Sequence, residues 1–276
     1  MLNMLKADFY RLLRGKAIYF AIVLMLFMLG LSIYGVSAGS VGMNATLGAS
    51  DEMDDLPYEQ TRSLSMSEYR KLALLAEGHP LDLDILTANM NLYYVFLFVA
   101  VIVLTADFSS GCVKNTLSSA IDRNKYFLSK LVMVNLCCTA LFFLNTYAAH
   151  FGTILFNSGK FASDIGTVTK VSLVQLPAIL ALVSILTGIG FLVKRTAVFN
   201  TVTIPFIIVF QLALQLCVTY FPIKKSFLQY ELESMIHRLA GDPTTGYLLR
   251  SYLVCAGIII VFNLLGYLSF RKAEIG

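Results

Sequence analysis

Six stretches without a charged side chain constrain this chain more than any other feature of its sequence. They cover residues 17–50, 85–106, 131–159, 171–193, 196–223 and 251–270. Each reaches the roughly 20 residues that a helix needs to cross about 30 Å of hydrocarbon. Because they are too long and too uniformly apolar for the alternating strands of a membrane barrel, they predict six transmembrane helices in an all-α integral membrane protein.

The composition agrees with this prediction. Charged side chains make up 14% of the 276 residues, against about 25% in soluble domains, so the polar surface of a soluble enzyme is missing. We therefore expect one transmembrane domain over residues 1–276. The apolar run that begins at Ala17 exceeds the roughly 7–15 residues of a signal-peptide core. It is expected to stay as the first span, with a cleaved signal as the alternative.

Positive residues in the connecting segments predict the orientation of the chain. With the N-terminus inside, the inner segments hold twelve basic and four acidic residues, and the outer segments hold nine basic and thirteen acidic ones. The inner segments thus carry +8 and the outer segments −4. This asymmetry predicts that both termini are cytoplasmic. It also places cations where anionic lipid headgroups or an acidic partner surface would meet them, so the bilayer is an expected partner and no nucleic acid is expected.

The segment before the first span, residues 1–16, has the pattern of an amphipathic helix. Its apolar residues fall within about a 100° arc of a helical wheel. They are Leu2, Leu5, Phe9, Leu12 and Leu13. The pattern predicts a helix that lies in the inner membrane interface, and a basic flank that only sets topology is the alternative.

Two outer segments also carry helical patterns. Residues 38–88 form an acidic extracytoplasmic insertion, in which a capping box predicts a short helix over about 66–77. Residues 221–250 contain an amphipathic pattern made by Leu228, Leu232, Met235, Ile236 and Leu239. Such a helix either caps a translocation path or rests on lipid, and the sequence favours the second interpretation.

No motif for catalysis or metal binding is found. The phosphate loop G-x-x-x-x-G-K-[ST] is absent, because the nearest string, at 158–161, lacks the final Ser or Thr and is not preceded by the first Gly. The five cysteines are an odd number, and four of them lie in apolar stretches, where they are expected to be small buried hydrophobes. We therefore expect no catalytic, cofactor or metal site in this chain.

Neutral amides supply most of the polarity of the spans. They are Asn135, Asn145, Gln175, Asn200, Gln211, Gln215 and Asn263. Such groups are expected to hydrogen-bond between helices. Ion-coupled carriers usually keep charges at membrane depth, so the uncharged spans disfavour a carrier or channel. His150, the only histidine in these stretches, is expected to be an interfacial residue.

The inner segment 107–130, DFSSGCVKNTLSSAIDRNKYFLSK, is the most informative of the connections. It is longer than a tight turn and rich in polar and basic residues. It either forms a short helix across the inner surface or only anchors the chain through its positive charges.

The 107–130 segment also carries a resemblance to a known family. It resembles the segment D-F-x-x-G-x-x-K-N-x-L-S…R-x-x-Y-x-x-S-K of the permease subunits of bacterial type-2 ABC exporters. The matching residues are Asp107, Phe108, Gly111, Lys114, Asn115, Leu117, Ser118, Arg123, Tyr126, Ser129 and Lys130. Cys112 and Ala120 stand where Thr and Gly are expected. The basic entry helix, the six spans and the outer amphipathic helix are similar to this family as well.

The resemblance implies a function. The 107–130 segment would be a coupling loop that docks on a separate ATP-binding subunit. The residues implied in docking are Asp107, Gly111, Lys114, Asn115, Leu117, Arg123 and Lys130. ATP and Mg²⁺ would be bound by that partner, and this chain would be a non-catalytic permease subunit that pairs with a second permease chain, identical or related.

The implied cargo is an amphipathic or hydrophobic substrate, such as a peptide, an antibiotic or a lipid-like molecule, exported across the bacterial cytoplasmic membrane. An immunity or sensory membrane protein on the same scaffold, with little transport, is the alternative.

Overall fold

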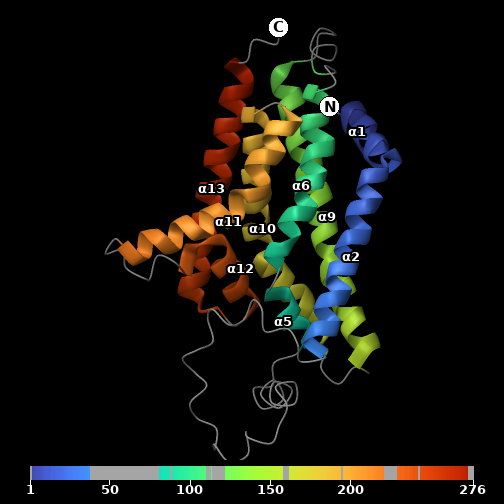
Figure 1. Ribbon diagram of the computed structural model, residues 1–276, viewed down its shortest axis with the longest axis vertical. Helices are drawn as coiled ribbons and strands as arrows, with labels where there is room; N and C mark the ends of the chain where they lie inside the picture. Colours follow the sequence, from blue (N-terminus) through green and yellow to red (C-terminus); the bar gives the residue numbers. More distant parts are fainter. Residues whose placement is uncertain are drawn as a thin grey trace, which may run out of the picture.

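The computed structural model describes residues 2–37, 81–87, 89–109, 113, 122–157, 162–193, 195–220, 229–241 and 243–272. Every element in these ranges is helical, and none of them is a strand. Figure 1 shows an elongated bundle in which most helices run along the long axis. The all-α class predicted from the sequence is therefore confirmed for the part of the chain that the structure describes.

Four described helices are long and apolar enough to cross a membrane. They are α2 (Lys16–Ser37), α9 (Arg123–Asn157), α10 (Ile165–Val193) and α13 (Thr245–Lys272). A further helix, α11 (Thr196–Tyr220), has 25 residues and no charged side chain. Its later part projects from the side of the bundle (Figure 1).

The second uncharged stretch, 85–106, lies within a broken run of short helices rather than in one regular helix. This run consists of α5 (Leu81–Thr87), η2 (Asn89–Asn91), α6 (Leu92–Ala100), η3 (Val101–Thr105) and α7 (Ala106–Ser109). The η3 segment is a π-helix, whose wider turn shifts the register of the backbone hydrogen bonds. The apolar part, Asn89–Thr105, is shorter than the four long helices.

The first helix, α1 (Leu2–Arg14), is separated from α2 by the single residue Gly15. The predicted helix is thus present, but its inward face differs from the predicted apolar arc. Leu12 and Asp8 are buried, whereas Phe9 and Leu13 are 46% and 44% exposed. The reason is that α1 packs against the bundle through the carboxylate of Asp8, which has a charged partner there, as well as through the apolar side chain of Leu12.

Helix α10 lies at the centre of the bundle and packs most closely on α13. Gly188 and Gly266 make this approach possible, since a Cβ on Gly188 would lie 2.7 Å from the carbonyl oxygen of Phe262. Residues 181–191 of α10 are buried without interruption. Small residues at a crossing of two membrane helices allow such close contact.

The predicted outer amphipathic helix is α12 (Leu232–Ala240). Its apolar residues are buried inside the protein and pack against α10 and α5. They are Leu232, Met235, Ile236, Leu239 and Ala240. The interpretation that this helix rests on lipid is therefore wrong, because its apolar face is already covered by other helices. The insertion helix predicted over 66–77 lies outside the described residues.

Buried amides connect the helices near α12. Asn89 donates to the Oε1 of Gln175 at 2.9 Å, and Asn145 donates to the Oδ1 of Asn89 at 3.3 Å. Gln175 donates in turn to the carbonyls of Leu86 in α5 and Ile236 in α12. The predicted interhelical role is confirmed for Asn145 and Gln175. Asn135 instead bonds the Leu131 carbonyl of its own helix.

His150 is buried between helices, and its predicted position at the membrane interface stays a prediction. Its Nδ1 lies 2.9 Å from the Oδ2 of Asp82, which also accepts a hydrogen bond from the Ser163 hydroxyl at 2.7 Å. The side chain is 4% exposed. The imidazole thus contacts Asp82 at the start of α5. Asp82 lies outside the uncharged stretches, so the sequence pattern did not indicate this partner.

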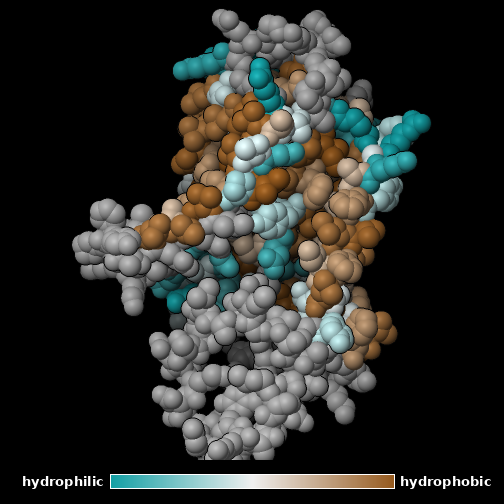
Figure 2. All heavy atoms as spheres, in the orientation of Figure 1, coloured by the Kyte–Doolittle hydropathy of each residue, from teal (hydrophilic) through white to brown (hydrophobic). Residues whose placement is uncertain are grey.

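The surface of the bundle is apolar along its flanks. Hydrophobic side chains cover much of the described flank in Figure 2, and hydrophilic ones lie at the end that carries α1 and in smaller groups lower on the same face. On α2 and α13 large residues such as Phe27 and Leu253 are more than half exposed. Cys137, Cys138 and Cys255 are free and buried, as the sequence predicts. This distribution fits a protein embedded in a membrane.

Candidate functional site

Asp107 and Lys130, the two ends of the 107–130 segment, meet inside the protein. The Nζ of Lys130 lies 2.5 Å from the Oδ2 of Asp107. Asp107 is 5% exposed and Lys130 is 2% exposed. The predicted boundaries change slightly, because α7 contains Asp107 and α9 already begins at Arg123. A direct ion pair therefore joins the first and the last residue of the segment, which together we call its base.

Helix α1 adds a second carboxylate and a second cation to this pair. Lys130 Nζ lies 2.7 Å from the Oδ1 of Asp8, and Arg11 forms an ion pair with Asp107. Asp8 and Arg11 are three residues apart, so they share one face of α1. Arg11 also donates to the carbonyl of Ile102, within the π-helical η3, at 3.2 Å. We call Asp8, Arg11, Asp107 and Lys130 the ion cluster.

The charges of the ion cluster balance, two positive against two negative. Burial alone lowers the pKa of Arg11, but Asp107 and Asp8 outweigh it and raise that pKa. Burial likewise works to raise the pKa of Asp107, but Lys130 and Arg11 hold that pKa below its ordinary value. The contribution of Asp107 to stability is therefore present above its unfolded pKa of about 3.9. It is lost only as the pH falls through the lower, folded value.

Tyr126 joins the ion cluster to a group of aromatic side chains. It lies one turn before Lys130 on the same face of α9, and its hydroxyl donates to the Oδ2 of Asp107 at 3.0 Å. Its ring stacks on Phe270 with centroids 5.5 Å apart. The aromatic group comprises Phe108, Tyr126, Phe127, Phe191, Tyr267 and Phe270. It links α7, α9, α10 and α13 at the α1 end of the bundle.

The beginning of α9 is also bound to the end of α13. Arg123 donates to the carbonyl of Arg271 at 3.0 Å, and the hydroxyl of Tyr267 donates to the Oδ1 of Asn124 at 2.9 Å. Arg123 and Asn124 are exposed. At the α1 end, the polar side chains of Arg123 and Asn124 are therefore exposed, and the ion cluster and the aromatic group lie next to them.

The residues predicted to dock a partner divide into three groups. Asp107 and Lys130 are brought together, but they are buried, so their side chains hold the base of the segment and do not face a partner. Arg123 is exposed and remains a candidate contact. Gly111, Lys114, Asn115 and Leu117 lie outside the described residues, and their docking role stays a prediction.

Asp8, Arg11 and Tyr126 are the members of the site that sequence reasoning did not assign. One signal was present, because Asp8 is the only acidic residue in positions 1–16. A lone carboxylate among cations on an amphipathic helix suggests a partner inside the protein. The described residues contain no group of three or more His, Cys, Asp or Glu side chains placed to hold a metal ion.

The ion cluster connects several helices through charged side chains. It pairs the buried Asp8, Asp107 and Lys130 with one another and with the exposed Arg11, and it joins α1, η3, α7 and α9 through one set of contacts. Removing a single partner from such a cluster leaves a buried charge uncompensated, which is costly. The two ends of the 107–130 segment, Asp107 and Lys130, are therefore bound to α1 by ion pairs.

Comparison with known protein families gives a match over most of the chain. The model of a family described as "Protein of unknown function (DUF2705)" matches residues 76–276. This range contains Asp107, Tyr126 and Lys130, and it begins after α1 and α2. No curated protein matches the chain.

Proposed function

The chain belongs to the family described as protein of unknown function (DUF2705), and from its site we propose that it is the membrane-spanning subunit of an ATP-driven ABC exporter. In this proposal the 107–130 segment docks on a separate ATP-binding subunit. The subunit moves an amphipathic or hydrophobic substrate, such as a peptide, an antibiotic or a lipid-like molecule, out of the cell. This chain itself hydrolyses nothing.

The ion cluster is the observation that carries the proposal. A loop that receives force from a partner must be held firmly at both ends, because a loose loop would absorb the movement. Asp107 and Lys130 close the base of the segment at 2.5 Å, and Asp8 and Arg11 connect that base to α1. Tyr126 extends the connection through Phe270 to α13. These contacts support a transmission role for the segment.

The proposed topology has six spans with both termini in the cytoplasm. It is supported by the excess of basic residues in the inner segments and by the position of α1 and the last turns of α13 at the same end of the bundle (Figure 1). In this topology the bundle end with α1 faces the cytoplasm, and the end with α12 faces outward. The protein would reside in the bacterial cytoplasmic membrane.

The proposed energy source is a partner chain. The phosphate loop is absent from this sequence, so ATP and Mg²⁺ would be bound by the ATP-binding subunit. Six spans correspond to half of such a transporter. The assembly would therefore contain two permease chains, identical or related, and two ATP-binding chains.

A charge reversal at the proposed docking surface tests this function. The double variant Lys114→Glu/Arg123→Glu is expected to lose the ATP-binding subunit during purification from membranes, because both cations would face the partner. The matched control is Lys272→Glu, an exposed cation at the end of α13 and at the same end of the bundle. Association that is unchanged in the double variant, or reduced as much in the control, would contradict the docking role. ATP-dependent efflux from reconstituted vesicles then separates an exporter from a protein that only protects or signals.

A further inference from the structure

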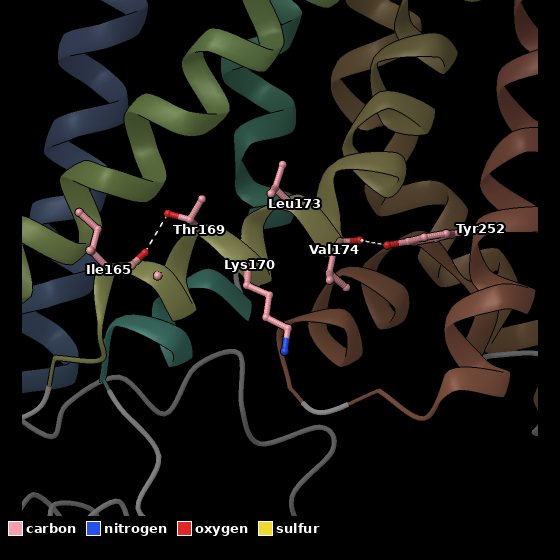
Figure 3. Close-up of a pocket in the computed structure, with 7 residues that line it drawn as sticks. Ile165, Thr169, Lys170, Leu173, Val174 and Tyr252 are labelled. Carbon is pink, nitrogen blue, oxygen red and sulfur yellow. Dashed lines mark hydrogen bonds between the residues drawn. The ribbon is translucent and has the colours of Figure 1, made fainter.

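An open groove lies on the flank of the bundle, between the first turns of α10 and Tyr252 of α13. Its volume is about 650 Å³, within the size range of small-molecule sites. Figure 3 shows Leu173 and Thr169 along one side of the groove, Lys170 on the other, and Tyr252 at its end. The lining is apolar apart from the ammonium of Lys170 and two hydroxyls. It thus combines one cation with an apolar wall.

The groove lies away from the place where α10 and α13 pack most tightly. They touch closely at Gly188 and Gly266, whereas near Lys170 the connection is the hydroxyl of Tyr252, which donates to the Val174 carbonyl at 3.1 Å. The hydroxyl of Thr169 donates to the Ile165 carbonyl at 2.8 Å. Both hydroxyl protons are therefore engaged, and Lys170 is the group left to bind a ligand by charge.

The position of Lys170 in the sequence fixes the depth of the groove in the membrane. Lys170 immediately precedes the uncharged stretch 171–193, so its ammonium lies where the span leaves the hydrocarbon. Leu173 and Val174 belong to the uncharged stretch. A lysine at this position directs its ammonium to the headgroups while its stem covers apolar surface. The groove therefore runs from the headgroup region into the hydrocarbon.

The charge of the groove is positive. Lys170 is exposed, and among the described residues no carboxylate lies within 4.0 Å of its Nζ. The nearest acid along the helix, Asp164, accepts a hydrogen bond from the backbone N–H of Gly166 at 2.9 Å. Its carboxylate thus caps the start of α10. An anionic group would complement Lys170 directly.

From these observations we propose that the groove binds one anionic phospholipid. Lys170 holds the phosphate of the headgroup, and one acyl chain lies along Leu173 and Val174 toward Tyr252. A soluble anion would gain nothing from the apolar wall, and a docked protein would need far more surface than this groove offers. The inference requires only that the protein is embedded in a membrane, and it is independent of the transport role proposed above.

Native mass spectrometry of the purified protein tests this site with two lipids that differ only in the headgroup. The probes are phosphatidylglycerol, which is anionic, and phosphatidylcholine, which is zwitterionic, with identical acyl chains. The wild-type chain is expected to retain phosphatidylglycerol in preference. Lys170→Gln is expected to reduce that retention about fivefold, which corresponds to about 1 kcal/mol for one cation near the membrane surface. Lys170→Arg is expected to restore it.

Two further variants keep the test specific. Arg250→Gln removes an exposed cation of α13 that does not line the groove, and it is expected to retain phosphatidylglycerol as the wild type does. Leu173→Trp fills the groove and is expected to lose the lipid. The proposal is overturned if both lipids are retained equally, if Lys170→Gln has no effect, or if Arg250→Gln reduces retention as much as Lys170→Gln.

Discussion

Lys130 is the residue on which the ion cluster depends, because its Nζ contacts both carboxylates. We expect Lys130→Met to destabilise the protein by about 3–5 kcal/mol, since the buried carboxylates of Asp8 and Asp107 would both lose the ammonium that lies within 2.7 Å of them. Thermal unfolding of the purified protein in mild detergent measures this effect. The control is Lys125→Met, which removes an exposed cation from the same helix and is expected to change the melting temperature little.

A double variant tests the coupling within the ion cluster. Asp8→Asn together with Lys130→Met is expected to destabilise less than the sum of the two single changes, because Lys130→Met takes the ammonium away from Asp8 and Asp8→Asn then removes the charge that lost it. Additive effects would show that the two residues do not act as a pair.

At Gly188 the addition of a single methyl group is expected to lower the stability of the protein. In Gly188→Ala the new Cβ would lie 2.7 Å from the carbonyl oxygen of Phe262, so α10 and α13 must move apart, at a cost of about 1–3 kcal/mol. Gly257→Ala on α13 is the control, because nothing lies within 4 Å of its Cβ position. A fall in melting temperature that is the same for both would contradict the close packing at Gly188.

Helices α5 and α12 form an element-scale unit because Gln175 bonds a carbonyl in each of them. We expect Gln175→Leu to leave the carbonyls of Leu86 and Ile236 without their donor, at a cost of about 1–3 kcal/mol for each unpaired group. Hydrogen exchange should then increase in α5 and α12 and stay low in α2 and α13. Asn135→Leu is the matched control, since its amide bonds only its own helix. Increased exchange throughout the bundle would contradict a local role.

The sequence predicted the elements better than it predicted their partners. Long uncharged stretches indicate long apolar helices, and α2, α9, α10 and α13 are present where they were expected. The interruption at η3 was not predictable, because the residues VIVLT contain neither Pro nor Gly. The face of α12 was predicted, but an amphipathic pattern does not say whether lipid or protein covers it.

The candidate site was predicted in part for the same reason. If every charged residue at the limit of a span is assumed to face water, Lys130 is expected to be exposed, whereas it is buried. Its partner Asp8 lies 122 residues away in the sequence, so no local pattern could pair them. Only the fold brings α1 beside α9.

At the scale of the whole molecule, the bundle has two distinct ends. The α1 end carries the ion cluster and the stacked aromatic rings, and the α12 end carries the buried amides and the contact of His150 with Asp82. The same two-ended arrangement underlies the proposed topology. In the proposed function, a movement at the 107–130 segment passes through α9 and α10, which run the length of the bundle (Figure 1), to α5 and α12 at the other end.

The composition of the complex extracted from native membranes tests the central claim most directly. The full-length chain is purified in mild detergent, and the mass and identity of every associated chain are determined. The account predicts two permease chains and two copies of a protein that contains the phosphate loop G-x-x-x-x-G-K-[ST], with ATP hydrolysis in the purified complex. A chain that purifies without any such protein, and without ATP hydrolysis, would contradict the account.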